Sequence, residues 1–404
     1  MNHMNSRTVV GLGIAAVAAI AIATGISLSR KPVADAAQGA GEVLPGLAEH
    51  VNDVRRISLT GPGQKLLVTL EKGEQGWSVK EKSGYRADAG KVREYLLRLS
   101  QSRLVEQKTA NERRYADIGV TDIGAAGAKG LLVALDGLPQ PAQLIVGIIN
   151  PRGDATYVRR AGDKPSWLAK GNLIPDKSAA NWLDKRIVDL PATRIREVSW
   201  SRPDGRSVRV FKTNAGDANY ALADLPKGRE LSSEFAANGE ATTLAGLNFD
   251  DVLTAAEAPA PTDAKAYRAT FLSFDGVVVE LVGWKKDERF YAQFQARKDE
   301  AAFDAALTAA QAQAKADRDA QQTAASADAA KPVATPPAAV ADPARERSER
   351  SAAVDAEVAE LGRRFSGWTF VLPAYKAAGF DKTADDFLKP LEDKKADAKK
   401  AAGK

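Results

Sequence analysis

The sequence predicts an α+β fold that is rich in strands and is built from two tandem copies of one strand–hairpin–helix module. Three observations predict it: short apolar runs alternate with turn residues, the order of these runs repeats once, and an amphipathic helix follows the first set of strands. One N-terminal transmembrane helix and a helical insertion near the C-terminus complete the predicted architecture.

The repeat is clearest where each copy begins. Each copy should start with three short strands joined by turns at Gly or Asp-Gly. The matching runs agree in residue type and spacing; they are 54–59 (VRRISL), 66–70 and 77–79 in the first copy, and 195–200 (IREVSW), 208–211 and 220–222 in the second.

A helix is expected after the third strand of each copy. Asp88 is a suitable N-cap in the first copy. One apolar face follows at helical spacing, formed by Val92, Tyr95, Leu96 and Leu99. Residues 232–247 occupy the corresponding place in the second copy, with a less regular pattern that contains Gly239 and Gly246.

Hairpins complete each copy. Residues 131–137 (LLVALDG) correspond to 270–276 (TFLSFDG), and a third strand carries Tyr157 in one copy and Tyr291 in the other. The remaining matches are 104–110 with 249–255, and 144–147 with 281–283.

These patterns divide the chain into eight parts. A linking helix should start near Asp176 and direct Trp182 and Leu183 inward. In order, the parts are a short tail and transmembrane helix (1–31), a stalk (32–50), the first repeat (51–175), the linking helix (176–193), the second repeat (194–297), an Ala/Pro-rich helical insertion (298–365), a final strand and C-terminal helix (366–391), and a charged, disordered tail (392–404).

The N-terminal apolar run predicts a membrane anchor. Val9 to Leu28 carries no charge, and about 20 helical residues span the roughly 30 Å hydrocarbon core. A cleaved signal peptide is the alternative, with Ala34-Asp35-Ala36 as its cleavage site. Arg7 on one side and Arg30 with Lys31 on the other leave the charge rule slightly against a cytoplasmic N-terminus. We nevertheless expect the body outside the cytoplasm, because a large domain can be exported regardless of its charge.

Composition excludes several kinds of chemistry. The 404 residues include no cysteine, which removes disulfides, thiolate metal sites and a Cys nucleophile. The two histidines are His3 and His50, so a His-based triad or zinc site is excluded from Val51 onward. The net charge of +5 is small, and no basic stripe with interleaved aromatics indicates nucleic acid as a partner.

Four acidic motifs are candidate sites. Asp136-Gly137 and Asp275-Gly276 lack the Asp-x-Asp-x-Asp array of a calcium loop and are predicted to be hairpin turns. Asp250-Asp251 and Asp385-Asp386 could form an acid/base pair, but solvated or capping carboxylates are far more common.

Glycine, tryptophan and arginine motifs are further candidates. Gly11-Leu12-Gly13 lies in the anchor, and Gly61-Pro62-Gly63 has no following helix and no Lys-Ser/Thr, so neither is a phosphate loop. The tryptophans favour core packing over a ligand platform; they are Trp77, Trp167, Trp182, Trp200, Trp284 and Trp368. Three basic pairs are expected at solvated strand edges or ends, namely Arg55-Arg56, Arg159-Arg160 and Arg363-Arg364. We therefore assign no catalytic, cofactor-binding or metal residue, and expect no cofactor.

The order of several motifs resembles a known family. After a bitopic N-terminus come 54–59 (VRRISL), 76–79 (GWSV), 96–99 (LLRL), 115–120 (YADIGV) and 182–186 (WLDKR). Together these are similar to the domain of unknown function 4340 family over roughly residues 50–295, whereas residues 298–365 depart from its usual pattern. The resemblance implies a bacterial, membrane-anchored protein with no assigned activity. Some such proteins are similar to auxiliary components of ABC-type exporters, including those linked to gliding motility.

The sequence thus predicts a non-enzymatic scaffold or auxiliary subunit, held in the bacterial inner membrane with most of the chain in the periplasm. Its expected partners are the membrane and an integral-membrane protein. The alternative is a periplasmic module that binds a lipid, glycan or peptide in the cleft between the two repeats.

Overall fold

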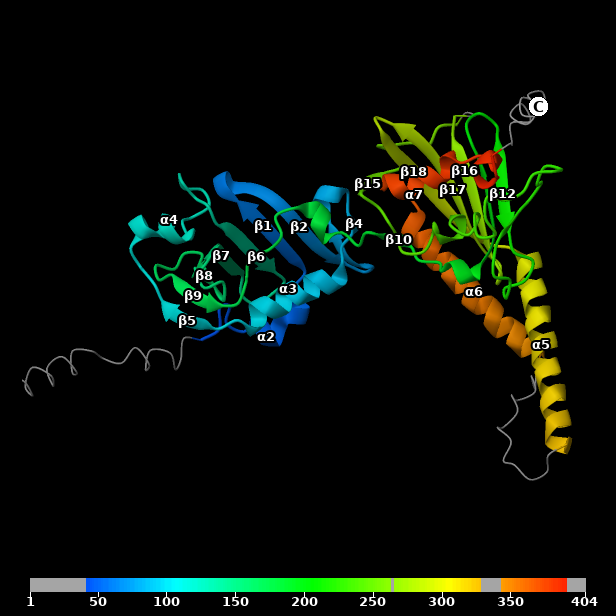
Figure 1. Cartoon of the computed structure of the whole chain (residues 1–404). Coiled ribbons are helices and arrows are strands. Elements are labelled where there is room, and N and C mark those ends of the chain that lie inside the picture. Colours follow the sequence, from blue (N-terminus) through cyan, green and yellow to red (C-terminus); the bar gives the residue numbers. More distant parts are fainter. Residues whose placement is uncertain (1–40, 263–264, 328–342, 391–404) are drawn as a thin grey trace, which may run out of the picture. The chain divides into compact units, whose positions relative to one another are not determined.

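The computed structural model describes residues 41–262, 265–327 and 343–390, in two compact units that divide between Leu183 and Asp184 (Figure 1). Each unit is built on one antiparallel sheet with few helices, so the predicted α+β class is confirmed. Within the described residues, no helix is both long enough and apolar enough to cross a bilayer. The predicted anchor Val9–Leu28, residues 328–342 of the predicted Ala/Pro-rich insertion and the 392–404 tail lie outside the described residues.

The sheet of unit 1 has the strand order β4-β3-β2-β1-β6-β7-β8-β9-β5. Alternation of apolar and polar residues directs one side of each strand into the core, as with Ile57 and Leu59 of β1. The strands are β1 (Arg56–Gly61), β2 (Lys65–Gly73), β3 (Gly76–Val79), β4 (Tyr85–Arg86), β5 (Leu104–Gln107), β6 (Leu131–Asp136), β7 (Ala142–Ile149), β8 (Ala155–Arg160) and β9 (Trp167–Lys170).

Helix α3 (Ala89–Gln101) forms as its sequence predicts. The Asp88 carboxylate accepts hydrogen bonds from the backbone N–H groups of Gly90 (2.9 Å) and Lys91 (3.1 Å), which confirms the N-cap. The predicted apolar face is buried, and the Tyr95 ring meets the Trp182 ring edge-on at 5.7 Å. Two single-turn helices, α2 (Leu47–His50) and α4 (Tyr115–Ile118), complete this unit.

The sheet of unit 2 has the order β13-β12-β11-β16-β17-β18-β19-β15, which repeats the order in unit 1 strand for strand apart from β4. Its strands are β11 (Ile195–Ser201), β12 (Ser207–Phe211), β13 (Ala221–Leu222), β15 (Asp251–Thr254), β16 (Tyr267–Ser273), β17 (Val277–Lys286), β18 (Arg289–Lys298) and β19 (Trp368–Leu372). A separate pair joins β10 (Arg186–Val188) to β14 (Leu247–Asn248).

The two sheets also share pairing register, and the register corrects the alignment of the two repeats that the sequence predicts. Ile57 pairs with Leu135 in unit 1, and Val198 pairs with Phe271 in unit 2. When the units are aligned through these two pairs, Asp136 directly follows Leu135, whereas Asp275 lies four residues after Phe271. The sequence match, which aligned the two Asp-Gly turns, was therefore displaced by three residues. The second hairpin is therefore longer.

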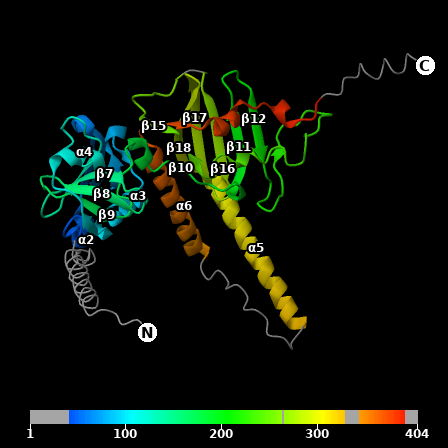
Figure 2. The same ribbon diagram turned by 60° about the vertical axis from the view of Figure 1, so that its left-hand side comes forward.

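The predicted insertion forms two helices between β18 and β19, where unit 1 has only the short 161–166 connection. Helices α5 (Glu300–Ala327) and α6 (Pro343–Phe365) both project from the same end of the sheet (Figures 1 and 2). Arg194 links α6 to the β16–β17 turn, because its guanidinium donates to Glu357 of α6 (2.9 Å) and to Asp275 of the turn (2.7 Å).

Four predicted segments differ from the structure. Residues 41–50, expected in a stalk, belong to unit 1, where Val43 and Leu47 are buried. The expected linking helix is a single 3-10 turn, Ala179–Trp182, because Asp176 accepts local hydrogen bonds from Ser178 and Asn181 that favour a turn. Trp182 and Leu183 are nevertheless buried, as predicted.

The other two differences lie in unit 2. Residues 232–247 form turns and one 3-10 turn (Glu240–Thr242) instead of a helix, because Gly239 and Gly246 interrupt the pattern and Gly246 adopts φ 54°. The expected C-terminal helix is reduced to α7 (Ala374–Ala377) and two 3-10 turns, whose Phe380 and Phe387 are buried.

Candidate functional site

One face of the unit 2 sheet is open and polar. Along β16, Tyr267, Ala269 and Phe271 point into the core, whereas Arg268 and Thr270 alternate with them on the opposite face. Register places Arg268 beside Val282 of β17, and Val282 beside Gln293 of β18. A neighbouring row across the same strands holds Thr270, Glu280 and Gln295.

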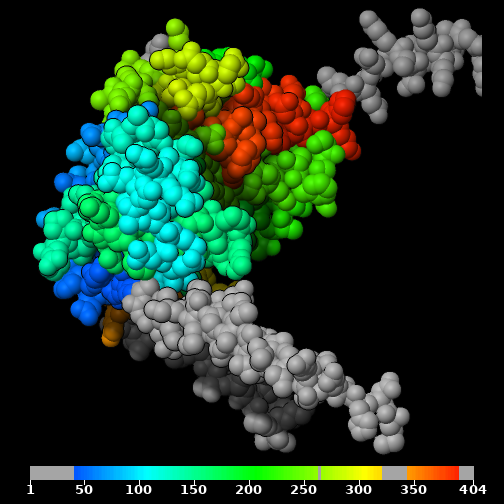
Figure 3. All heavy atoms as spheres, turned by 90° about the vertical axis from the view of Figure 1, so that its left-hand side faces the viewer, coloured from blue at the N-terminus to red at the C-terminus, as the bar shows by residue number. Residues whose placement is uncertain are grey.

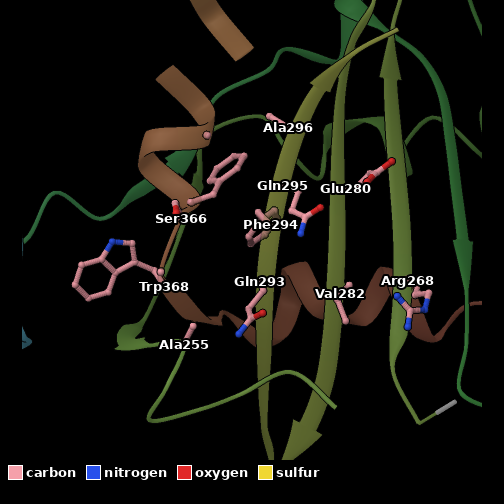
Figure 4. Close-up of a pocket in the computed structure, with 13 residues that line it drawn as sticks. Ala255, Arg268, Glu280, Val282, Gln293, Phe294, Gln295, Ala296, Ser366 and Trp368 are labelled. Atoms are coloured by element: carbon pink, nitrogen blue, oxygen red, sulfur yellow. The ribbon is translucent and has the colours of Figure 1, made fainter. Parts of the chain in front are cut away.

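A groove of about 550 Å³ lies where this face meets the end of α6 (Figure 4). Its size falls in the range of about 300–1,000 Å³ that is typical of ligand sites. Five of the lining residues, Arg268, Glu280, Val282, Gln293 and Gln295, come from the face itself. The remaining lining residues are Ala255, Phe294, Ala296, Gly362, Phe365, Ser366, Gly367 and Trp368.

The groove exists because β18 and β19 separate. Their pairing extends only from Phe290–Leu372 to Ala292–Phe370. Beyond that point the Phe294 ring packs on Phe365 of α6, with 5.4 Å between the ring centroids. The turn from α6 into β19 therefore lies beside β18 and forms one side of the groove.

In the groove, Gln293 and Glu280 have partners, whereas the cation of Arg268 has none among the described residues. The Gln293 side-chain amide donates to Thr369 Oγ1 at 2.9 Å, and Glu280 pairs with Arg297 at 2.9 Å. Among the residues that the structure describes, the side chain of Arg268, which lines the groove and is exposed, has no hydrogen-bond or ion-pair partner. Arg268 also borders a second hollow of about 550 Å³ that includes Ser199, Ser207 and Arg209.

In unit 1 the equivalent face is covered by the chain itself. The cover is the connection from β5 to β6, residues 108–130, and it includes α4. Tyr115, Val120 and Ile123 of the cover are buried against Ile145 of β7. The cyan atoms that face the viewer in Figure 3 include this segment.

A buried arginine holds the cover in place. Arg159 of β8 is 3% exposed, donates from Nε to the Val120 carbonyl (2.9 Å) and pairs with the Asp122 carboxylate (2.5 Å). It also lies over the Tyr115 ring, 4.7 Å from the centroid. The prediction that Arg159-Arg160 is solvated is therefore wrong, because Arg159 is buried and the half-buried Arg160 donates to the carbonyls of Glu42 and Val43.

The acidic candidates have structural roles in the described residues. Gly137 and Gly276 follow their aspartates with φ of 97° and 89°, which confirms the hairpin turns. Asp251 pairs with Arg289 at 3.4 Å, and Asp385 pairs with Arg229 at 3.5 Å. Neighbouring Asp386 caps a 3-10 turn through Thr383, so neither carboxylate pair is brought together as an acid/base couple.

The other candidates divide. Gly61-Pro62-Gly63 forms the tight β1–β2 connection. Trp182 and Trp200 are buried in their cores, as predicted, whereas the other four tryptophans are half-buried. Of these, Trp368 lines the groove and Trp284 stacks on Tyr291 at 5.8 Å. Arg55, Arg56 and Arg363 are exposed, as predicted.

Shifted titrations in unit 2 follow from packing and ion pairs. Burial raises the pKa of Tyr220 to about 12, and burial lowers the pKa of Lys376, whose ammonium donates to three backbone carbonyls. Burial would raise the pKa of Asp381, but hydrogen bonds from Lys285 and Tyr267 outweigh it and hold that pKa below its usual range. Within the described part of the chain, no three acidic or histidine side chains gather to hold a metal ion.

Comparison with known proteins identifies the family. A family model described as a domain of unknown function (DUF4340) matches residues 77–270. The predicted resemblance to the DUF4340 family is confirmed over these residues. The DUF4340 match includes α3 and the unit 1 cover, and it ends within β16, before Val282 and Gln293 of the groove. Comparisons with the curated proteins and with the solved structures found no match.

Sequence reasoning did not single out Arg268, Val282, Gln293 or Gln295. Their alternation with apolar residues is typical of any solvent-facing side of an antiparallel sheet. One available signal was the length of a connection. Residues 255–266 of unit 2 are about half as many as residues 108–130 of unit 1, and they offer fewer apolar side chains to cover the face.

Proposed function

We propose that this DUF4340 protein is a non-enzymatic scaffold, anchored in the bacterial inner membrane by residues 9–28, with its body outside the cytoplasm. In this role it is an auxiliary subunit of a membrane complex, most simply an ABC-type exporter. The observation that carries the proposal is the open face of unit 2, because the equivalent face of unit 1 is covered by its own chain.

The side-chain chemistry supports a binding role. Three of the four carboxylates weighed as acid or base, Asp251, Asp385 and Asp386, are engaged in ion pairs or a cap. From Val51 onward the sequence contains neither histidine nor cysteine. The open face presents an arginine and two side-chain amides in a groove, and these groups suit recognition of a partner.

Two measurements test the scaffold role. In spheroplasts with an intact inner membrane, added protease should cut the body, which should stay attached to the membrane in untreated cells. Affinity purification from solubilised membranes should recover an integral-membrane transporter subunit. A body protected until lysis, or repeated recovery without such a subunit, would contradict the proposal.

A second candidate function is a periplasmic module that binds a lipid or glycan. The polar groove of about 550 Å³ within unit 2 favours it. Native mass spectrometry of the full chain, extracted in mild detergent, distinguishes the two. A bound lipid or glycan of constant mass would support the module, and a co-isolated protein subunit would support the scaffold.

A further inference from the structure

The cover of unit 1 shows what an uncovered face of this sheet can hold. Pairing equates Leu132, Ile145 and Arg159 of unit 1 with Arg268, Val282 and Gln293 of unit 2. In unit 1 this row lies beneath the cover, whose aliphatic side chains pack on Ile145. The cover's Asp122 meets the arginine that the sheet presents.

Unit 2 presents the same kinds of groups without the cover. Val282 supplies an apolar floor, and Arg268 supplies a cation with no partner in the described residues. Gln295, at the rim, is exposed and makes no hydrogen bond within the same set. A carboxylate on Arg268 would form a charge-assisted hydrogen bond, the stronger kind.

The chain's own connection does not supply a cover here. None of residues 255–262 is buried. The Ala258 carbonyl accepts hydrogen bonds from the Thr369 hydroxyl (2.7 Å) and the Gln293 amide (3.4 Å), so the connection passes beside β19 and leaves Arg268 and Val282 in the open groove. Trp284 also occupies the position equivalent to Gly147, where a Cβ would lie 2.2 Å from the Ile118 carbonyl oxygen of the cover. A cover laid over the sheet as in unit 1 would therefore collide with Trp284.

We propose that the groove binds a segment of a partner protein in which an Asp or Glu lies next to aliphatic residues. The carboxylate pairs with Arg268, an aliphatic side chain rests on Val282, and the backbone meets the Gln295 amide. The inference rests on the proposed scaffold function and names the kind of partner surface it uses. The chain's own C-terminal residues 391–404 fit less well, because they carry five lysines against three acidic residues.

The test places a photo-reactive benzoylphenylalanine at Gly362, in the full chain and in the cells that produce it. Gly362 lines the groove, and an added Cβ there meets no atom within 4 Å. The control position is Gly216, which is equally open and does not line the groove. Irradiation should link position 362, and not position 216, to a protein segment that contains Asp or Glu, as read by peptide mass spectrometry.

Charge variants then decide whether Arg268 is the anchor. Arg268→Gln and Arg268→Glu should reduce the adduct at least tenfold, whereas Lys227→Glu, on an exposed loop of the same unit, should leave it unchanged. Replacing the partner's acidic residue with Lys should restore the adduct to Arg268→Glu. Melting curves of the variants should coincide, because the Arg268 side chain makes no hydrogen bond or ion pair within the described residues.

Several outcomes would overturn the inference. No adduct at position 362, or an adduct whose yield does not change with the Arg268 variants, would contradict it. So would an adduct with a lipid, a glycan, a second copy of this chain or the chain's own tail. Failure of the charge exchange to restore the adduct would also contradict it. The scaffold role fails separately. If a transporter subunit still co-purifies with Arg268→Glu, the scaffold role is supported and the groove assignment is wrong. If an Arg268-dependent adduct forms with a soluble protein, the groove assignment is supported and the scaffold role is wrong.

Discussion

The same sheet face is closed in unit 1 and open in unit 2, and a few residues account for the difference. In unit 1, Gly147 lets the cover backbone approach the sheet, and Arg159 binds its carbonyl and carboxylate groups. In unit 2, the equivalent positions carry Trp284 and Gln293, and the connection that could cover the face is about half as long. A shared strand order can thus support a self-contained core in one unit and a free surface in the other.

The glycine beneath the cover should be the most sensitive point of the comparison. Gly147→Ala places a Cβ 2.2 Å from the Ile118 carbonyl oxygen, so the cover must shift. We expect unit 1 to lose about 3 kcal/mol of stability, the upper part of the usual range for overpacking. Hydrogen exchange of the full chain should show the loss in residues 115–123. Gly216→Ala, in open space, is the control, and equal effects of the two would refute the explanation.

The arginine that binds the cover should have the next largest effect. Arg159→Met keeps an apolar stem but leaves the Val120 and Asp163 carbonyls without this donor. We expect a loss of about 2 kcal/mol, the cost of orphaned buried polar groups. Urea unfolding measures it. Arg268→Met on the open face is the matched control and should stay within about 0.5 kcal/mol; a similar loss there would mean that Arg268 has a structural role.

The first repeat's helix offers a smaller contrast. Asp88→Ala removes the N-cap of α3, and we expect a loss of about 1 kcal/mol. Ser232→Ala, at the start of the segment that forms turns in unit 2, should have almost no effect, because there is no helix to cap. Thermal unfolding of both variants checks this, and equal losses would show that Asp88 is not needed as a cap.

The smallest expected effect is a pH dependence in unit 2. The pKa of Asp381 is lowered in the folded protein, so the stability it contributes is complete above its usual pKa of 3.8. That contribution is lost as the pH falls through the lower, folded-state value. Asp381→Asn should therefore show a shallower loss of stability below about pH 4 than the wild type. Denaturant midpoints at pH 7 and pH 3 measure this loss. An equal loss of stability in the wild type and in Asp381→Asn would contradict the role given to Asp381.

The parts of the fold that the sequence predicts are those with strong local periodicity. The α3 face, its Asp88 cap, the Asp-Gly turns and the helices of the insertion follow from spacing and turn chemistry alone. The 232–247 helix failed because tertiary packing can use turns wherever glycine weakens a short helix.

The groove could not be predicted in the same way. Its floor consists of residues from three strands, and its wall from the end of a helix far along the chain. Arg159 and Arg268 look alike in sequence, since each stands in a strand among apolar residues. Only the presence of a cover over one face and not over the other separates a buried arginine from an available one.

The insertion between β18 and β19 also has a consequence for how unit 2 folds. Residues 299–367 separate these neighbouring strands, about tenfold more than the 161–166 connection of unit 1. An unstructured link of that length would add roughly 2 kcal/mol of closure entropy. Pairing of α5 with α6, through contacts such as that of Arg347, near the start of α6, with Asp304, near the start of α5, shortens the effective link. We expect the helical pair to form first and the β15–β19 edge to join the sheet last, so the rate of folding depends on a part of the chain outside the sheet.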